Sequence, residues 1–356
     1  MDFDDRFALD NKASSLSWIR RYDDHTTTDK LKDNLHAYNL SCKVEFENGE
    51  KWIVRFSMVG KVVHADEKIE AEVATMKLIR QQTTIPVPDV KAWVLAVDNV
   101  LGIGPFIMMG FIEGISVDRI LQNPDARIMQ QDVSDNVIET IFRQMVDFLL
   151  QLLNRNFSCI GSLTSGFEVD FGGFSATVCS RPLSKKSHDF LLDGGVDVFG
   201  KCNISTMEQL LTTSPAPRSK TFASTAKYFH YIIDGDLQHL HDQPNSVDNE
   251  HDAREMYIYF NIMKSLVSRH FLLNQDTGPF KLTCDDLQPT NMIVNNEQDL
   301  KIVGVLDWEW SYAAPAQLAS TPWWLLIESS NVWSYIDKRL DRFDQLLELY
   351  EERISS

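Results

Sequence analysis

Alternating hydrophobic and polar positions mark the first clear element of the chain, a β-hairpin. Residues 43–46 alternate, Asn48-Gly49 is the pair preferred in tight turns, and residues 52–56 alternate again. On the second predicted strand, Arg55 falls on the face opposite to the large apolar residues. The pattern therefore places the cation of Arg55 among apolar neighbours, where it needs an anionic partner.

A helical pattern follows over residues 66–82 and stops before Pro86. One stripe of this helix carries its apolar residues, Ile69, Val73, Met76 and Ile79. Glu72 borders the stripe, so it is placed to meet Arg55 and form the strand-cation and helix-glutamate pair that positions the α- and β-phosphates in kinases. The alternative is a surface ion pair that contributes about 0 to 1 kcal/mol.

The middle of the chain predicts a strand and a long helix. Residues 104–114 form an apolar run that ends in a glycine-marked segment, which predicts a strand followed by a turn. Ser134 is placed as the N-cap of a helix. The apolar residues of that helix recur at helical spacing: Ile138, Ile141, Met145, Phe148, Leu149 and Leu152.

A second hairpin is predicted near the end, where residues 292–294 and 302–306 are short apolar runs joined by a polar stretch. Asn291 enters the first of these strands and Asp307 leaves the second. Antiparallel pairing brings both side chains to the same edge of the hairpin, and Asp286 lies on the loop just before it.

This arrangement of side chains suits metal-assisted phosphate chemistry. Asn291 and Asp307 are hard oxygen donors, and Mg²⁺ takes few protein ligands while leaving its other positions to water and phosphate. Asp286 is then free to accept a hydrogen bond from an attacking hydroxyl, which is the role of the catalytic-loop aspartate in kinases. The alternative is an acidic loop and an ordinary hairpin whose carboxylates face water.

Composition narrows the classes of protein. With 356 residues, 44% of them hydrophobic, the chain can bury a large core and is expected to form two lobes or domains. The formal net charge of -17 argues against nucleic acid and against anionic membranes as partners. It would favour a cationic acceptor, but we prefer the interpretation that the surplus acidic residues serve solubility, because the charge is spread along the chain.

The cysteines and the first residues indicate the compartment. Cys42, Cys159, Cys179, Cys202 and Cys284 are widely separated and form no C-x-x-C, so neither a disulfide framework nor a zinc site is indicated. Residues 1–20 hold several aspartates and no apolar segment, unlike a signal peptide, and no window is long enough to span a membrane. We expect a cytoplasmic protein.

Several motifs in order resemble the aminoglycoside phosphotransferase and choline kinase-like family, in particular its fungal branch. They are the D-x-x-x-x-N of Asp286 and Asn291, the L-D-W-E that holds Asp307, the segment 72–76 with 84–88, and the Ile-Gly-Ser-Leu at 160–163. The resemblance implies a bilobal, protein-kinase-like α+β fold, with a small antiparallel-sheet N-lobe and a larger, mostly helical C-lobe.

The same resemblance divides the chain and assigns the nucleotide contacts. It implies an N-lobe at 1–107, a lobe linker at 108–114 and a C-lobe at 115–356 that carries the catalytic loop and the acceptor pocket. Backbone groups of Met109, Gly110 and Phe111 are expected to contact adenine. The segment 36–42 is expected to cover the phosphates, with the hydroxyl of Ser41 as one contact.

Four features depart from the family pattern. Cys284 stands where the family usually has His, and Asp285 where it has Gly; the usual His supports the loop, so we interpret Cys284 as structural. Asp285 either binds a second cation, raises the pKa of Asp286 or faces solvent. Segment 36–42 contains no glycine, and Gln317 replaces an acid that relatives tend to carry.

These observations predict an ATP- and Mg²⁺-dependent phosphotransferase acting on a hydroxyl of a small molecule, with Asp286 as the catalytic group. The alternative is a pseudokinase that serves as a nucleotide-binding or scaffold module, which Cys284, the glycine-free segment and Gln317 favour. A protein kinase is disfavoured because L-D-W-E replaces D-F-G and no A-P-E segment is present. The acceptor, the choice between ATP and GTP, and the oligomeric state are left open by the sequence.

Overall fold

The computed structural model describes residues 39–58, 64–121, 133–170, 173–180, 218–242, 249–270 and 276–318, with the single residues 62, 182 and 247. None of the helices in these ranges combines the length and the apolar character that crossing a bilayer requires. The expectation about residues 1–20 lies outside the described ranges, as do residues 36–38 of the predicted phosphate-covering segment.

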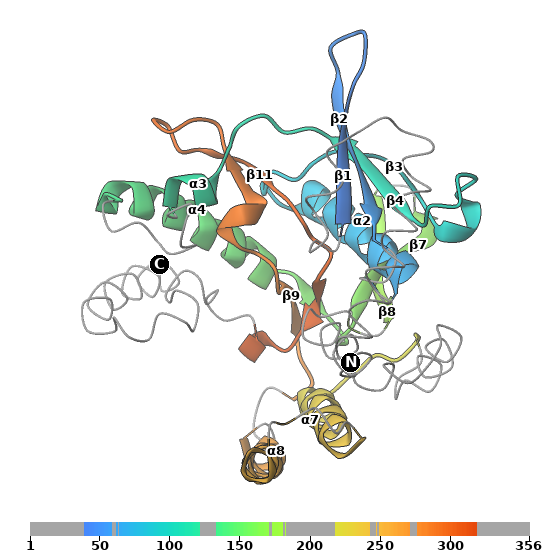
Figure 1. Ribbon diagram of the computed structural model, residues 1–356, viewed down its shortest axis with the longest axis vertical. Coiled ribbons are helices and arrows are strands. Elements are labelled where there is room, and N and C mark those ends of the chain that lie inside the picture. The colour runs from blue at the N-terminus through green and yellow to red at the C-terminus, as the bar shows by residue number, and fades with distance from the viewer. Residues whose placement is uncertain are drawn as a thin grey trace.

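The first part of the chain forms a four-stranded antiparallel sheet (Figure 1) in the order β1-β2-β4-β3. Its strands are β1 (Asn39–Glu45), β2 (Lys51–Ser57), β3 (Val90–Val94) and β4 (Phe106–Gly110). Strands β1 and β2 pair from Asn39 opposite Ser57 to Glu45 opposite Lys51. Gly49 has a φ of 82° in the turn between them. The predicted first hairpin is confirmed.

Helix α2 (Ala65–Gln82) packs against one face of this sheet and begins and ends close to the predicted bounds. The apolar stripe foreseen from the sequence is buried, since the exposed fraction is 0% for Ile69, Val73 and Ile79 and 2% for Met76. The other face of the sheet has its own apolar cluster: Leu40, Val54, Phe56, Met58 and Ile103. Arg55 alternates with these residues along β2 and therefore faces α2.

After β4 the chain leaves the sheet through residues 111–114, because 108–110 still belong to β4. The segment then forms β5 (Ile115–Ser116), which pairs with β10 (Met292–Val294), and the short helix α3 (Val117–Leu121). Gly114 allows this close passage, since its φ is 153° and a Cβ there would collide with the carbonyl oxygen of Val294.

The second part is built around helix α4 (Asp135–Leu153), which confirms the predicted long helix. Ser134 occupies the N-cap position, where its carbonyl accepts from the backbone N–H of Val137 at 3.0 Å, while its side chain makes no capping bond. One apolar cluster unites α2, β4, α4 and the later strands, so both parts of the chain share a core.

Small sheets and two long helices complete the described fold. Strand β10 pairs with β11 (Ile302–Val305), while β9 (Phe280–Cys284) lies between β6 (Asn156–Phe157) and β12 (Ser311–Ala314). Strands β7 (Ser162–Asp170) and β8 (Gly173–Ser180) form a hairpin. Three short 3-10 turns are η2 (Ala96–Asp98), η3 (Pro289–Asn291) and η4 (Ala316–Leu318).

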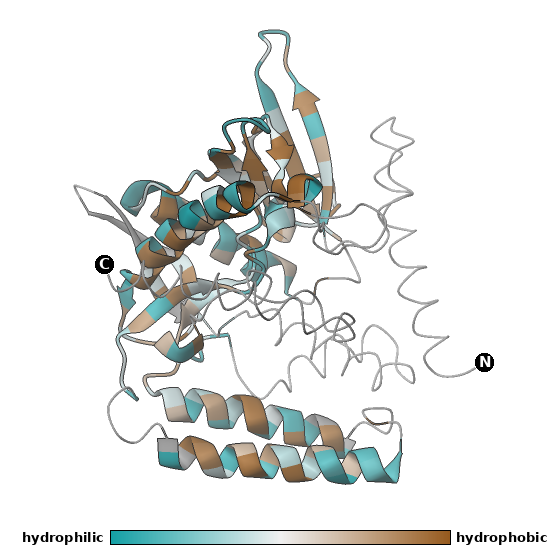
Figure 2. Ribbon diagram, turned by 90° about the vertical axis from the view of Figure 1, so that its left-hand side faces the viewer, coloured by the Kyte–Doolittle hydropathy of each residue, from teal (hydrophilic) through white to brown (hydrophobic). Residues whose placement is uncertain are grey.

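Helices α7 (Thr225–Asp242) and α8 (Glu250–His270) pack against each other at the end of the molecule opposite to the β1–β2 hairpin (Figures 1 and 2). An antiparallel sheet with one main helix is thus followed by a region dominated by helices. The predicted α+β class with a small sheet-based lobe is confirmed.

Candidate active site

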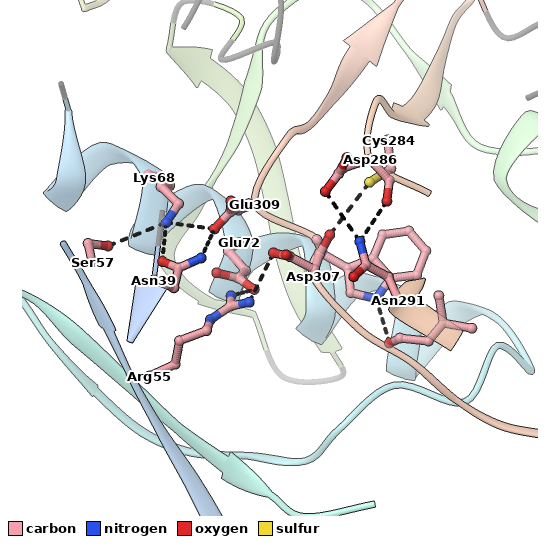
Figure 3. Close-up of polar contacts among 12 residues, drawn as sticks. Asn39, Arg55, Ser57, Lys68, Glu72, Cys284, Asp286, Asn291, Asp307 and Glu309 are labelled. Carbon is pink, nitrogen blue, oxygen red and sulfur yellow. Dashed lines mark hydrogen bonds and ion pairs between the residues drawn. The ribbon is translucent and has the colours of Figure 1, made fainter. Parts of the chain in front are cut away.

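Arg55 and Glu72 form a buried ion pair between β2 and α2 (Figure 3), through Nη2 and Oε1. Arg55 is 8% exposed and Glu72 is 0% exposed, so the alternative of a surface pair is excluded. Burial alone would lower the pKa of Arg55, but the nearby carboxylates of Glu72, Asp307 and Glu309 raise it above its usual value. The guanidinium is therefore a permanent charge at this position.

The other terminal nitrogen of the Arg55 guanidinium contacts Asp307, which directly follows the last paired residues of the β10–β11 hairpin. Nη1 of Arg55 donates to Oδ1 of Asp307 at 2.9 Å. This contact was not predicted, because the two residues lie 252 positions apart in the sequence. It joins the cation expected to hold phosphates to the carboxylate expected to hold metal.

Asn291 and Asp307 lie at the same edge of the β10–β11 hairpin, as predicted. Met292 pairs with Val305, and beyond this pair the N–H of Leu306 donates to the carbonyl of Asn291 at 2.7 Å. At the far end of the hairpin, Asn296 closes the turn by accepting the backbone N–H groups of Gln298 and Asp299. The separation of the two candidate ligands is therefore fixed by the main chain.

Asp307 adopts a left-handed backbone conformation with a φ of 62°. Aspartate tolerates this region better than most residues do. Its side chain is 22% exposed. Burial raises the pKa of Asp307 to about 8, and Glu309 adds to the rise while Arg55 opposes it. A cation bound beside Asp307 would stabilise the charged form of this carboxylate, which burial disfavours.

Asp286 lies in the loop after β9, and two amides orient its carboxylate. Nε2 of Gln288 donates to Oδ1 of Asp286 at 3.0 Å. Nδ2 of Asn291 donates to Oδ2 of Asp286 at 3.3 Å and to the backbone carbonyl of Asp286 at 2.8 Å. Oδ1 of Asn291 has no hydrogen-bond partner among the residues that the structure describes. That oxygen is the atom of Asn291 that can face a metal ion.

Two of the departures from the family pattern now have structural partners. The thiol of Cys284 donates to the carbonyl of Asp307 at 3.8 Å, and burial raises the pKa of this thiol. This contact agrees with a supporting role for Cys284 and argues against a nucleophile. The hydroxyl of Tyr312 donates to Oδ1 of Asp285 at 3.4 Å, which holds that carboxylate beside β12.

A second buried ion pair lies beside the first and was missed from the sequence. Nζ of Lys68 lies 2.6 Å from Oε2 of Glu309, and both side chains are 1% exposed. Asn39 completes the group: its Oδ1 accepts from Lys68 at 2.6 Å and its Nδ2 donates to Glu309 at 2.7 Å. One available signal was the position of Lys68, one helical turn before Glu72 and hence on the same face of α2.

The remaining candidates lie in the sheet. Ser41 is exposed on β1 directly opposite Arg55, so both side chains are on one face of the sheet. Met109 pairs with Ile53 within the sheet, and the N–H groups of Gly110 and Phe111 donate to the carbonyls of Asp89 and Lys51. These backbone N–H groups serve sheet pairing, which differs from the adenine contact expected of them.

The oxygen atoms of Asn291 and Asp307 fit the Mg²⁺ ion that the sequence implies. The described ranges hold no group of three or more His, Cys, Asp or Glu that could bind a metal through protein ligands alone. A metal here would take the carboxylate of Asp307 and Oδ1 of Asn291, with its other positions left to water and phosphate, as Mg²⁺ prefers. Arg55 lies beside them with its Nε buried and unpaired in the described part of the chain.

A strand arginine fixed by a helix glutamate, an oriented loop aspartate and an Asn-Asp pair at a hairpin edge together define a kinase-like phosphotransferase that acts on hydroxyl groups. The sequence comparison agrees with this class. The chain belongs to the phosphotransferase enzyme family, whose model matches residues 34–317. This membership confirms the predicted protein-kinase-like fold.

Solved structures of phosphotransferases resemble the chain at low sequence identity. A type I macrolide 2'-phosphotransferase is 9% identical over 89% of this chain and 75% of its own, with a TM-score of 0.43. The GDP and kanamycin complex of APH(2")-IIia is 12% identical over 96% and 99%, with a TM-score of 0.43. The macrolide 2'-phosphotransferase MphH from Brachybacterium faecium is 13% identical over 90% and 75%, with a TM-score of 0.42. No curated protein matches the chain.

Proposed function

We propose that this protein transfers the γ-phosphoryl group of ATP to a hydroxyl of a small molecule in a Mg²⁺-dependent reaction. The observation that carries the proposal is the convergence of Arg55, Asp286, Asn291 and Asp307, which come from separate elements, on one region (Figure 3). Phosphoryl transfer needs positioning and charge stabilisation more than covalent chemistry, and these side chains supply both.

Asp286 is the proposed catalytic group. It accepts a hydrogen bond from the acceptor hydroxyl, orients it for attack and takes its proton as the new P–O bond forms and the bond from the γ-phosphorus to the bridging oxygen breaks, which releases ADP. Gln288 and Asn291 hold the carboxylate before the acceptor arrives, so little reorganisation is needed.

Asn291 and Asp307 are the proposed metal ligands. Mg²⁺ bound there would neutralise negative charge on the transferred phosphoryl group. Asp307, which contacts Arg55 through Oδ1, would give a carboxylate oxygen to the ion, and the guanidinium of Arg55, which Glu72 keeps in place, would bind phosphate oxygens. Ser41 is proposed as an additional phosphate contact because its side chain lies on the same face as Arg55.

Adenine recognition is proposed for the end of β4 and the segment that follows it. The N–H groups of Gly110 and Phe111 are bonded within the sheet, but that of Ile112 has no partner among the described residues. The carbonyls of Met109 to Phe111 remain part of the proposed contact region, while the free donor shifts to Ile112. We retain the division into an N-lobe at 1–107 and a C-lobe at 115–356 as a proposal, with 111–114 as the segment that is free of regular structure.

The acceptor is proposed to be a small molecule with a free hydroxyl. The net charge of -17 favours a cationic acceptor over an anionic one. No side chain in the described ranges fixes the identity of this molecule further.

A second candidate is a nucleotide-binding module without turnover. The observation that favours it is the contact between Arg55 and Asp307, because these two groups of the proposed nucleotide site occupy each other in the ligand-free protein. The two candidates differ in a measurable way, since an inactive module binds nucleotide but forms no phosphorylated product.

The test is calorimetric titration with a non-hydrolysable ATP analogue, with and without Mg²⁺, on the wild type and the Asp307→Asn variant. Asparagine keeps the left-handed backbone at position 307 and removes only the charge. We expect binding that requires Mg²⁺ and is lost in the variant. Absence of nucleotide binding by the wild type would exclude both candidates. Binding should then be followed by an acceptor screen with Asp286→Asn as the inactive control.

A further inference from the structure

The ion pair between Lys68 and Glu309 is unusual because both charges are almost completely removed from water. Removing two charges from solvent is unfavourable, and apolar residues of similar size often stabilise a fold equally well. We therefore expect this ion pair to have a role other than stabilising the fold. Its position beside the proposed nucleotide site indicates what that role is.

The pair joins three segments at one point (Figure 3). Lys68 lies on α2 one turn before Glu72, Glu309 lies two residues after Asp307, and Asn39 is the first residue of β1. Asn39 accepts from Lys68 and donates to Glu309, so the three side chains close a ring of polar contacts. Ser57 of β2 adds a weaker contact to Lys68 at 3.4 Å.

Two ion pairs thus connect the sheet and α2 to the segment after β11: Arg55 of β2 with Asp307, and Lys68 of α2 with Glu309. Ligand binding is expected to affect these two contacts differently. The contact between Arg55 and Asp307 would be loosened by ligands, because Asp307 would bind a metal ion and Arg55 would bind phosphates. The contact between Lys68 and Glu309 is not expected to open, because the side chains of both residues are 1% exposed and Asn39, the second partner of Glu309, is partly buried beside them. Asp307, at 22% exposed, is the carboxylate that ligands can reach.

We propose that Lys68, Glu309 and Asn39 are positioning residues for the phosphotransfer reaction, and this inference rests on the proposed function. They hold residues 307–310 against α2 and β1, so that the Asp307 carboxylate stays at the metal position after Arg55 releases it. Glu309 accordingly acts as an anchor of the metal-binding segment and not as a metal ligand. Partners of this kind typically change metal affinity by about 10- to 100-fold when they are removed.

The test replaces the ion pair with apolar side chains of similar volume in the variant Lys68→Met/Glu309→Leu. Because both charges are removed together, no uncompensated charge is left in the core, and the fold is expected to persist. The matched control is Asp234→Asn/Lys264→Gln, which removes the exposed ion pair between α7 and α8, far from the site. Both proteins are compared with the wild type.

Two readouts separate positioning from stability. The first is the dissociation constant of the non-hydrolysable ATP analogue with and without Mg²⁺, and the second is hydrogen exchange of the peptide that covers residues 306–311. For the double variant we expect an unchanged melting temperature, Mg²⁺-dependent binding weakened at least about tenfold, and faster exchange in this peptide. The control should match the wild type in both readouts.

Wild-type binding and exchange in the double variant would overturn the inference while leaving the proposed function intact. If the wild type itself binds no nucleotide, the proposed function fails, and the positioning role fails with it. Should the double variant melt much earlier than the wild type, Asn39→Ala takes its place, because it opens the ring and leaves the ion pair in the core. Unchanged affinity and exchange in Asn39→Ala would then overturn the inference.

Discussion

Replacing Asp307 with asparagine should stabilise the ligand-free protein while abolishing the proposed metal site. Burial raises the pKa of Asp307 from 3.8 to about 8, so the folded state disfavours the charged form. One pKa unit corresponds to about 1.4 kcal/mol, and at pH 7 this shift amounts to roughly 4 kcal/mol of instability. The side chain is partly exposed and asparagine weakens the contact with Arg55, so we expect a net gain of about 2 kcal/mol.

The gain should depend on pH in a defined direction. Between pH 4 and pH 8 the folded wild type binds more protons at Asp307 than the unfolded chain does, so its stability falls as pH rises relative to the variant. The stability difference is therefore small near pH 4 and largest at pH 8 and above. Urea unfolding of both proteins at half-unit steps measures it, because the other titrating groups are shared.

Added Mg²⁺ provides the internal control, since it should stabilise the wild type at pH 8 and leave Asp307→Asn unchanged. A variant that is less stable than the wild type at pH 8 would refute the reasoning. That result would mean that the ion pair between Arg55 and Asp307 outweighs the burial of the carboxylate.

Three further predictions follow from the described contacts. Asp286→Asn should keep Mg²⁺-dependent nucleotide binding and lower kcat by about 10²- to 10⁴-fold, measured with an acceptor identified by screening; equal turnover would remove Asp286 from its role. Because burial raises the pKa of the Cys284 thiol, iodoacetamide at pH 8 should modify it only after unfolding, as peptide mass spectrometry can show. Gly114→Ala should destabilise the fold by about 3 kcal/mol or more because its Cβ meets the carbonyl of Val294, whereas Gly49→Ala, in open space, should cost only about 1 kcal/mol of backbone strain; similar melting temperatures would contradict this difference.

Local signals in the sequence were sufficient for the elements that position the site. The Asn48-Gly49 turn and the alternation around it predicted the β1–β2 hairpin, and the spacing of apolar residues predicted α2 and α4. The pair between Arg55 and Glu72 was also predictable, because strand alternation and helical periodicity each fix the direction of one partner.

The contacts that were missed depend on the packing of distant segments. Asn39 and Glu309 are 270 positions apart, and no local pattern reports that their elements meet. The burial of Lys68 was equally hidden, because a lysine at the border of an apolar stripe usually reaches solvent. The use of the Gly110 and Phe111 amides in sheet pairing depends on Asp89 and Lys51, whose register only the folded sheet determines.

The main-chain hydrogen bond between Asn291 and Leu306 fixes one end of the β10–β11 hairpin, and the turn closed by Asn296 fixes the other. The distance between these two ends should therefore stay constant. Gln298 is exposed in the turn at the far end of the hairpin, and this turn begins at Asn295, roughly 13 Å along the strand from Asn291 at about 3.3 Å per residue. A spin label at Gln298 would therefore keep a constant distance to Mn²⁺ bound in place of Mg²⁺. A second label at the tip of the β1–β2 hairpin would then report movement of the sheet, with the first distance as the internal standard.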